Sequence, residues 1–216
     1  MTLPAQLTLV LALSSQAATP APALSKAIRA VPDIPRHPVI QSEYVALSNG
    51  QHRAFFARGL ARRAQWADLV DHALESAALP SWLAAVPLVE SSYANWGAPG
   101  AAEPQRTAPG TVLGRGLWMF IPQTARQYGL RVDEQVDERL DPELETAAAM
   151  ALLTDLHDEF GDWGLALAAY NQGARAVRKA IHSSDSRSVL RLIELGALSP
   201  YAARVMAAAL LMESTQ

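Results

Sequence analysis

Residues 85–93 read AVPLVESSY, and the interpretation of the whole chain starts from this stretch. An apolar helical run that leads directly into a carboxyl group predicts a buried environment for Glu90. Because burial penalises the charged form of a carboxyl group, we expect its pKa to be raised and its protonated form to persist near neutral pH. A general acid needs that protonated form. A single glutamate at a helix end is most often exposed, so the interpretation depends on further motifs.

Two later runs supply these motifs. Residues 114–125 read GRGLWMFIPQTA, and residues 168–173 read AAYNQG. In this order, and with the Glu90-Ser91 pair, they resemble the catalytic domain of the lytic murein transglycosylases. The resemblance lies within the soluble-lytic-transglycosylase-like superfamily, is closest to its membrane-bound type D branch, covers residues 42–212 and is densest between 80 and 182. It implies an all-α, lysozyme-like helical domain of the goose-type lysozyme and transglycosylase kind.

The amino-acid composition agrees with an all-α fold and limits the classes of function to be considered. Half of the 216 residues are hydrophobic, which is enough for one buried core, and few alternating strand patterns occur. The net charge of −3 gives no basic surface of the kind that nucleic-acid-binding proteins present. The chain has no cysteine, and its five histidines show no metal-ligand spacing. We therefore expect no metal, no cofactor and no nucleic-acid partner.

The chain divides into three parts. Residues 1–18 combine a short apolar run with small residues, which is typical of a secretory signal peptide, although no Lys or Arg precedes Lys26. A disordered apolar tail or a misassigned start codon are the alternatives. Residues 19–41 contain five prolines and predict an extended linker. Residues 42–216 form the helical domain, with a catalytic core at 80–182. We expect a periplasmic protein without a membrane anchor.

Several helices can be placed from local patterns. Apolar residues at helical spacing predict an amphipathic helix through residues 66–77. Pro80 is expected to open the helix that carries Glu90, with a kink or loosened turn near Pro87. Asp141 is expected to cap a helix whose buried side contains Leu144, Ala148, Ala151, Leu152, Leu156 and Phe160. Further helices are expected around 187–195 and 200–212, and residues 95–115 read as a long loop.

The family resemblance implies a mechanism that needs one carboxyl group. Glu90 would protonate the oxygen between N-acetylmuramic acid and N-acetylglucosamine, and would then take a proton from the C6 hydroxyl of the muramoyl ring. That hydroxyl attacks C1 and leaves a 1,6-anhydro end. Because this nucleophile is intramolecular, no second carboxylate has to activate water. Other acidic residues in this part of the chain include Glu103, Asp133, Glu134 and Asp137. None of them belongs to a motif directed at Glu90.

The first two motifs suggest several groups around the acid. Ser91 could hydrogen-bond the carboxyl group or a sugar, or could be an ordinary helix-terminal residue. Gly116 is expected to allow close approach of an extended ligand, and Trp118 to form a wall of the groove or part of the core. Met119 stands where the family commonly has Gln. One polar contact to an acetamido group would therefore be replaced by an apolar one. Tyr93 is expected to pack beneath the acid.

The last motif and the C-terminal region add three more candidates. Tyr170 is expected to place its hydroxyl near Glu90, with core packing as the alternative. Asn171 can cap a helix end and present its amide to a sugar. Tyr201 could reach the groove or pack in the core.

These residues leave three functions open. The resemblance favours a lytic transglycosylase that acts on peptidoglycan glycan strands, with a cell-envelope assembly or secretion complex as a candidate partner. A hydrolytic muramidase on the same fold would need a carboxylate that holds water opposite Glu90. An inactive glycan-binding module would have kept the groove and lost turnover.

Overall fold

The structure is a computed structural model, and it describes residues 31, 34–49, 52–100 and 114–215. Within these ranges the chain is helical and contains no extended β-strand; paired residues occur only as isolated bridges, such as Arg115 with Phe120. The all-α prediction is confirmed. The elements are α2 (Pro38–Ser48), α3 (Arg53–Ser76), η1 (Ser81–Ala84), α4 (Ala85–Ser91), α5 (Pro122–Gln127), η2 (Glu138–Leu140), α6 (Pro142–Phe160), α7 (Trp163–Gln172), α8 (Ala174–Ser184), α9 (Val189–Glu194) and α10 (Tyr201–Ser214).

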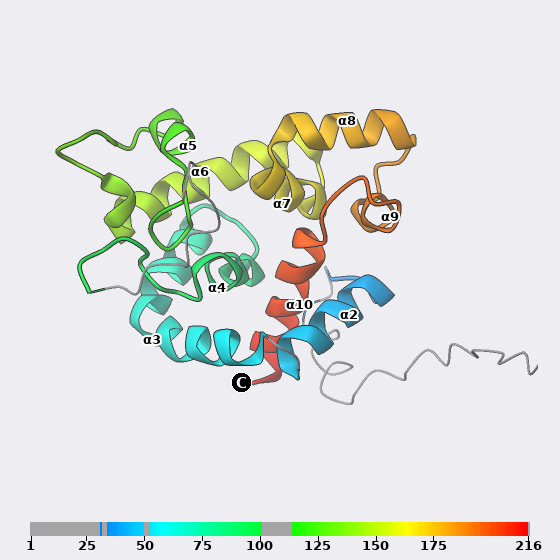
Figure 1. The fold of residues 1–216 in the computed structure, drawn as a ribbon, viewed down its shortest axis with the longest axis horizontal. Helices are drawn as coiled ribbons and strands as arrows, with labels where there is room; N and C mark the ends of the chain where they lie inside the picture. The colour runs from blue at the N-terminus through cyan, green and yellow to red at the C-terminus, as the bar shows by residue number, and fades with distance from the viewer. Residues whose placement is uncertain (1–30, 32–33, 50–51, 101–113, 216) are drawn as a thin grey trace, which may run out of the picture.

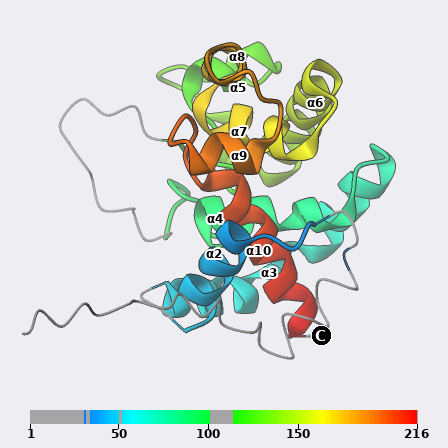
Figure 2. The same ribbon diagram turned by 90° about the vertical axis from the view of Figure 1, so that its right-hand side faces the viewer.

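Helix α10 runs through the middle of the domain (Figure 1). It packs against α2, α4 and α7, and in Figure 2 it starts below α9 and runs past α2 toward the C-terminus. Most of α10 is buried, and small residues such as Ala203 and Ala207 allow its neighbours to come close. Helix α10 thereby brings its first residue, Tyr201, next to the end of α4.

The boundary predicted at residue 41 differs from the structure. Helix α2 begins at Pro38, so residues 38–41 belong to a helix and not to an extended linker. Proline is tolerated there because the first residue of a helix has no intrahelical partner for its N–H group. Ile40 and Tyr44 are buried, and Glu43 forms an ion pair with Arg204 of α10. The predicted signal peptide and most of the predicted linker lie outside the described residues, as do residues 101–113 of the predicted loop.

The segment that carries Glu90 is divided before Pro87. Pro80 precedes a 3-10 turn, η1, and the α-helical geometry starts at Ala85. Pro87 therefore lies in the first turn of α4, where a missing N–H group is least harmful. The predicted loosened turn exists, but it is the junction of η1 with α4.

Helix α6 begins as predicted, because the Asp141 side chain accepts hydrogen bonds from the N–H groups of Glu143 and Leu144. Its predicted buried side was wrong at two positions, since Leu144 and Ala151 are exposed. The buried stripe runs instead through Glu145, Thr146, Ala148, Ala149, Met150, Leu152, Leu153, Leu156 and Phe160. Because the buried side of α6 contains a glutamate, Glu145, the apolar pattern alone did not identify that side correctly. Within the described ranges, no helix combines the length and hydropathy needed to cross a bilayer.

Candidate active site

Glu90 lies in the last turn of α4 and lines a cavity. This cavity has a volume of about 670 Å³. The helix stops directly after Ser91 because Ser92 and Tyr93 both adopt left-handed backbone conformations, with φ values of 55° and 53°. The Tyr93 hydroxyl donates to the Ala84 carbonyl at 2.6 Å, which fastens the end of α4 to the end of η1. As predicted, Tyr93 is buried in the core.

The environment of Glu90 favours its protonated form. Burial raises the pKa of Glu90 to about 7, while an interaction with the Tyr201 hydroxyl lowers it. Valine and leucine side chains precede Glu90, and Val86 and Leu88 are completely buried. The side chain itself remains partly exposed and lines the cavity. Glu90 is therefore a carboxyl group that keeps a proton near neutral pH and can reach a ligand.

A tight turn from Gly114 to Phe120 lies beneath the cavity. The Arg115 N–H group donates to the Phe120 carbonyl at 3.1 Å and closes this turn. At Gly114, a Cβ atom would lie 2.1 Å from the Met119 carbonyl oxygen, so only glycine fits. At Gly116, φ is +82° and a Cβ atom would lie 2.2 Å from both the Arg139 carbonyl oxygen and the Glu145 carboxylate. Gly116 thus permits close packing inside the protein. It is buried and does not line the cavity, contrary to the expectation of a ligand contact.

Trp118 belongs to the core and does not form a wall of the groove. Its side chain is completely buried, and its indole N–H group donates to the Thr146 hydroxyl at 3.0 Å. The next residue, Met119, has a φ value of 57° and lines the cavity together with Phe120. The turn therefore passes from the core at Leu117 and Trp118 to the cavity at Met119 and Phe120. The position where the family commonly has Gln faces the cavity.

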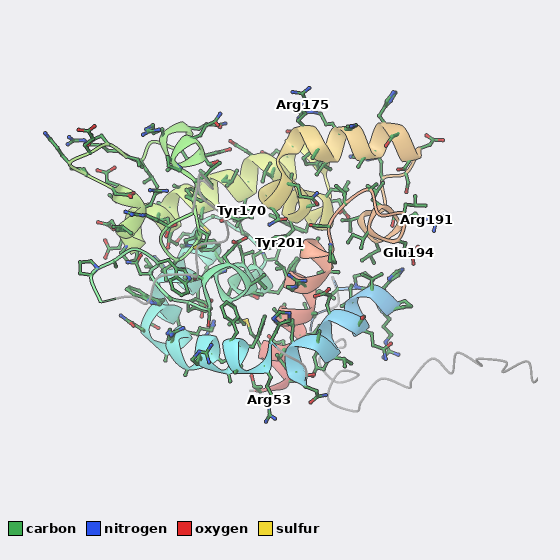
Figure 3. The ribbon with its side chains drawn as sticks, viewed as in Figure 1. Arg53, Tyr170, Arg175, Arg191, Glu194 and Tyr201 are labelled. Carbon is green, nitrogen blue, oxygen red and sulfur yellow. The ribbon has the colours of Figure 1, made fainter. Side chains whose placement is uncertain are left out.

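Two tyrosines adjoin Glu90 from different helices. Tyr170 of α7 and Tyr201 of α10 have nearly parallel rings, with centroids 6.5 Å apart and an interplanar angle of 6° (Figure 3). The Tyr170 hydroxyl donates to the Trp118 carbonyl at 2.6 Å. Burial and the Glu90 charge raise the pKa of both tyrosines well above its usual value. Both hydroxyls therefore stay protonated and face the acid as neutral groups.

The two hydroxyls differ in their partners. The donor of Tyr170 is already used by Trp118, so only its oxygen lone pairs are available to a protonated Glu90 or a ligand. The Tyr201 hydroxyl is buried, and among the described residues no partner meets full hydrogen-bond geometry. An interaction with this hydroxyl nevertheless lowers the pKa of Glu90, so the two groups are neighbours, and the Tyr201 donor has no other partner among the described residues.

Asn171 and Ser91 differ in their access to the cavity. Asn171 lines it, and its side-chain oxygen accepts from the Ser199 hydroxyl at 3.3 Å, which leaves its amide nitrogen available. Gly173, and not Asn171, is the C-cap residue of α7. The Ser91 hydroxyl is completely buried and donates to the Pro87 carbonyl at 3.0 Å. Ser91 therefore stabilises α4 and has no free hydroxyl for a sugar.

Sequence reasoning missed Glu145. It lies in the first turn of α6, near the positive end of the helix dipole, and its side chain is completely buried. Its carboxyl oxygens accept from the N–H groups of Leu117 at 2.6 Å and Trp118 at 3.2 Å. Burial raises the pKa of Glu145 to about 8, against the effect of these hydrogen bonds and of Arg139. The available signal was Gly116, whose partner could not be identified from local sequence.

Two further carboxyl groups line the cavity. Asp155 accepts from the Tyr128 hydroxyl at 3.0 Å, and Glu159 is paired with Arg178. Among the described residues, no group of three His, Cys, Asp or Glu side chains is arranged to hold a metal ion. The chemistry that these residues can provide is acid and base chemistry centred on Glu90.

The described residues form an all-helical domain in which Glu90, a carboxyl group that keeps its proton near neutral pH, lies at the end of a short helix and lines a cavity. Residues 71–192 match the family described as "Transglycosylase SLT domain", and the chain belongs to this family. It is similar to membrane-bound lytic murein transglycosylase D of Escherichia coli, in strain K12 and in an O6:H1 strain, with 36% identity over 110 residues in each case. The match covers 50% of this chain and 22% of the relative, so the chain spans about a fifth of that protein's length.

A solved structure also matches. It is an inactive mutant of the lytic transglycosylase Slt from Pseudomonas aeruginosa, with 20% identity and a TM-score of 0.48. The match covers 76% of this chain and 24% of that one.

Proposed function

We propose that this protein is a peptidoglycan lytic transglycosylase. Glu90 protonates the glycosidic oxygen between N-acetylmuramic acid and N-acetylglucosamine as the bond to C1 breaks. The resulting carboxylate accepts the proton of the muramoyl C6 hydroxyl, whose oxygen attacks C1. The products are a chain with a 1,6-anhydromuramic end and a chain with a free N-acetylglucosamine hydroxyl, and no water is consumed.

The observation that carries this proposal is the state of Glu90. Its pKa of about 7 lets the same group be an acid in the first step and a base in the second, near neutral pH. Tyr170 offers an acceptor and Tyr201 a donor, so each protonation state of Glu90 has a complementary neighbour. Asn171 and Met119 line the adjoining cavity and would contact the sugars.

A hydrolytic muramidase is the second candidate, and Asp155 and Glu159 are the observation that favours it. Either would have to hold a water molecule against the sugar on the face opposite Glu90. Both have partners already, namely Tyr128 and Arg178. Glu145 is too deeply buried to activate water in the cavity. An inactive glycan-binding module is disfavoured because Glu90 retains its buried environment and both tyrosines.

The test is the end-group chemistry of muropeptides released from purified sacculi by the full chain. We expect 1,6-anhydromuramic ends, which are lighter by one water than the reducing ends made by a muramidase. Reducing ends would move the protein to the hydrolases, and the Asp155→Asn and Glu159→Gln variants would then identify the second carboxylate. Binding to sacculi without any release would support the glycan-binding module instead.

We also propose that the protein acts in the periplasm, where its substrate lies. The support is the apolar run followed by small residues at 1–18. N-terminal sequencing of the protein from a periplasmic fraction is expected to start after residue 18. An intact N-terminus in the cytoplasmic fraction would contradict this location.

A further inference from the structure

Glu145 is a buried charged-type residue that the proposed reaction does not use. Its carboxyl group occupies the inner side of the turn from Gly114 to Phe120, where the N–H groups of Leu117 and Trp118 both point at it. Successive backbone N–H groups that converge in this way form an anion-binding concavity. Because Gly116 has no side chain, the turn can close around the carboxyl group. Glu145 therefore fixes the shape of this turn from below.

The same turn is fixed at other atoms by neighbouring residues. Thr146 accepts from the Trp118 indole, and Arg139 donates to the Phe120 carbonyl at 2.9 Å. The Trp118 carbonyl, which belongs to the next peptide group along the chain, accepts the Tyr170 hydroxyl at 2.6 Å. A continuous path of hydrogen bonds thus joins Glu145 to Trp118 and Trp118 to Tyr170. Tyr170 in turn lines the same cavity as Glu90, and the Glu90 charge raises the pKa of Tyr170.

From this path we propose that Glu145 is a positioning residue for the transglycosylase reaction. It orients the Trp118 carbonyl, which in turn binds the Tyr170 donor and directs the Tyr170 lone pairs toward Glu90. Glu145 also holds Met119 in its left-handed conformation at the cavity. This inference rests on the proposed function, because its effect is on turnover of the same site. Glu145 itself touches no substrate.

An apolar side chain of similar volume would fill the space without desolvating a carboxyl group, but it would leave the N–H groups of Leu117 and Trp118 unpaired. Buried N–H groups without partners are strongly disfavoured. A glutamine keeps one acceptor and turns its amide N–H₂ toward the other N–H group. Glu145→Gln should therefore preserve the fold while tilting the Trp118 peptide group, which makes it the informative substitution.

The experiment is a double-mutant cycle with Glu145→Gln and Tyr170→Phe, assayed for release of muropeptides from sacculi. We expect Glu145→Gln alone to lower kcat about tenfold, in the range for one misplaced orienting contact, with a smaller change in KM. In the Tyr170→Phe background, the same substitution should lower kcat less than about twofold, because the Tyr170 hydroxyl through which Glu145 would act is already absent. Glu143→Gln, on the exposed face of the same helical turn, is the matched control and should match wild type.

Two results would overturn the proposal. The first is a tenfold loss in both backgrounds, which would make Glu145 a general structural residue. The second is a lowered melting temperature with unchanged kcat. Failure of the proposed function is separate from both: wild type would then release no 1,6-anhydro products, whereas failure of this inference leaves wild-type activity intact and changes only the pattern of the cycle.

Discussion

Glu90 and Glu145 are two carboxyl groups of one domain, and they differ in exposure: Glu90 is partly exposed and lines the cavity, whereas Glu145 is completely buried. Both have a pKa raised by burial, to about 7 and about 8 respectively. Glu90 lies in the last turn of a short helix, lines the cavity and interacts with the Tyr201 hydroxyl. Glu145 begins a long helix, is sealed from solvent and is held by the N–H groups of Leu117 and Trp118.

A raised pKa alone does not identify a catalytic residue. Burial alone raises the pKa of either group, and structural carboxyl groups share that property with catalytic ones. Access to a ligand separates them here. The two groups are nevertheless joined through Trp118 and Tyr170, so the sealed carboxyl group can influence the accessible one without contact.

The largest expected effect is the loss of turnover in Glu90→Gln. The amide has nearly the same shape but cannot donate and retrieve a proton, so release of muropeptides should fall by at least ~10²–10⁴-fold. Glu143→Gln should keep full activity. A Glu90→Gln variant with a tenth of wild-type activity would contradict the assignment of Glu90 as the catalytic acid, because access to the cavity would then not distinguish the catalytic carboxyl group from Glu145.

A second prediction concerns stability and tests both carboxyl groups together. Each has a pKa above the ordinary 4.5, so the folded protein binds these protons more tightly than the unfolded chain does. This stabilisation is complete below pH 4.5 and is lost as the pH rises through about 7 and about 8. The melting temperature should therefore fall between pH 5 and pH 8.5.

Glu90→Gln separates the two contributions. The amide cannot ionise, so at pH 8.5 the variant should be more stable than wild type by up to about 3 kcal/mol, and the advantage should shrink toward pH 5. Glu145→Gln should gain less, because it loses one of the two N–H partners of the carboxyl group. Thermal melts at both pH values measure this. Equal melting temperatures of Glu90→Gln and wild type at pH 8.5 would show that Glu90 is already well solvated.

Tyr170→Phe should slow the reaction by about ten- to a hundredfold, which corresponds to one orienting contact. The ring still packs against Phe120 and Tyr201, so the melting temperature should change little. The hydroxyl lost is the one that joins Trp118 to the acid. Unchanged kinetics would mean that Tyr170 only packs in the core. They would also contradict the proposal that Glu145 acts on Glu90 through Trp118 and Tyr170.

Much of this arrangement could be predicted from local sequence. The helical class, the capping by Asp141 and the burial of Glu90 follow from periodicity and from apolar neighbours, which act within a few residues. Glu145 could not be found in this way, because its partners lie 27 and 28 residues earlier in the chain. For the same reason Gly116 was assigned to the ligand, and Trp118 stayed open between a wall of the groove and the core. A glycine needed for a close approach does not reveal whether the neighbour is a sugar or a carboxyl group.

Tyr201→Phe should change the pH profile more than the maximal rate. The Tyr201 hydroxyl lowers the pKa of Glu90, so its removal should raise that pKa further. The alkaline limb of the kcat/KM profile, where the acid form of Glu90 is lost, should move to higher pH. Tyr44→Phe is a suitable control, because its hydroxyl bonds Ser214 at the far end of α10. A shift to lower pH would mean that Tyr201 stabilises the protonated form instead.

The smallest expected effect is that of Met119→Gln, which restores the residue common in the family. Met119 lines the cavity above the turn that Glu145 holds, so the new amide should face a bound acetamido group. One added hydrogen bond of ~0.5–1.5 kcal/mol should lower KM about two- to tenfold, with little change in kcat. If the residue instead packed inward, the amide would lack partners and the protein would lose ~1–3 kcal/mol of stability. A thermal melt beside a digestion assay distinguishes these outcomes. A destabilised variant with unchanged KM would show that the turn faces the other way, and that Glu145 shapes the core and not the cavity.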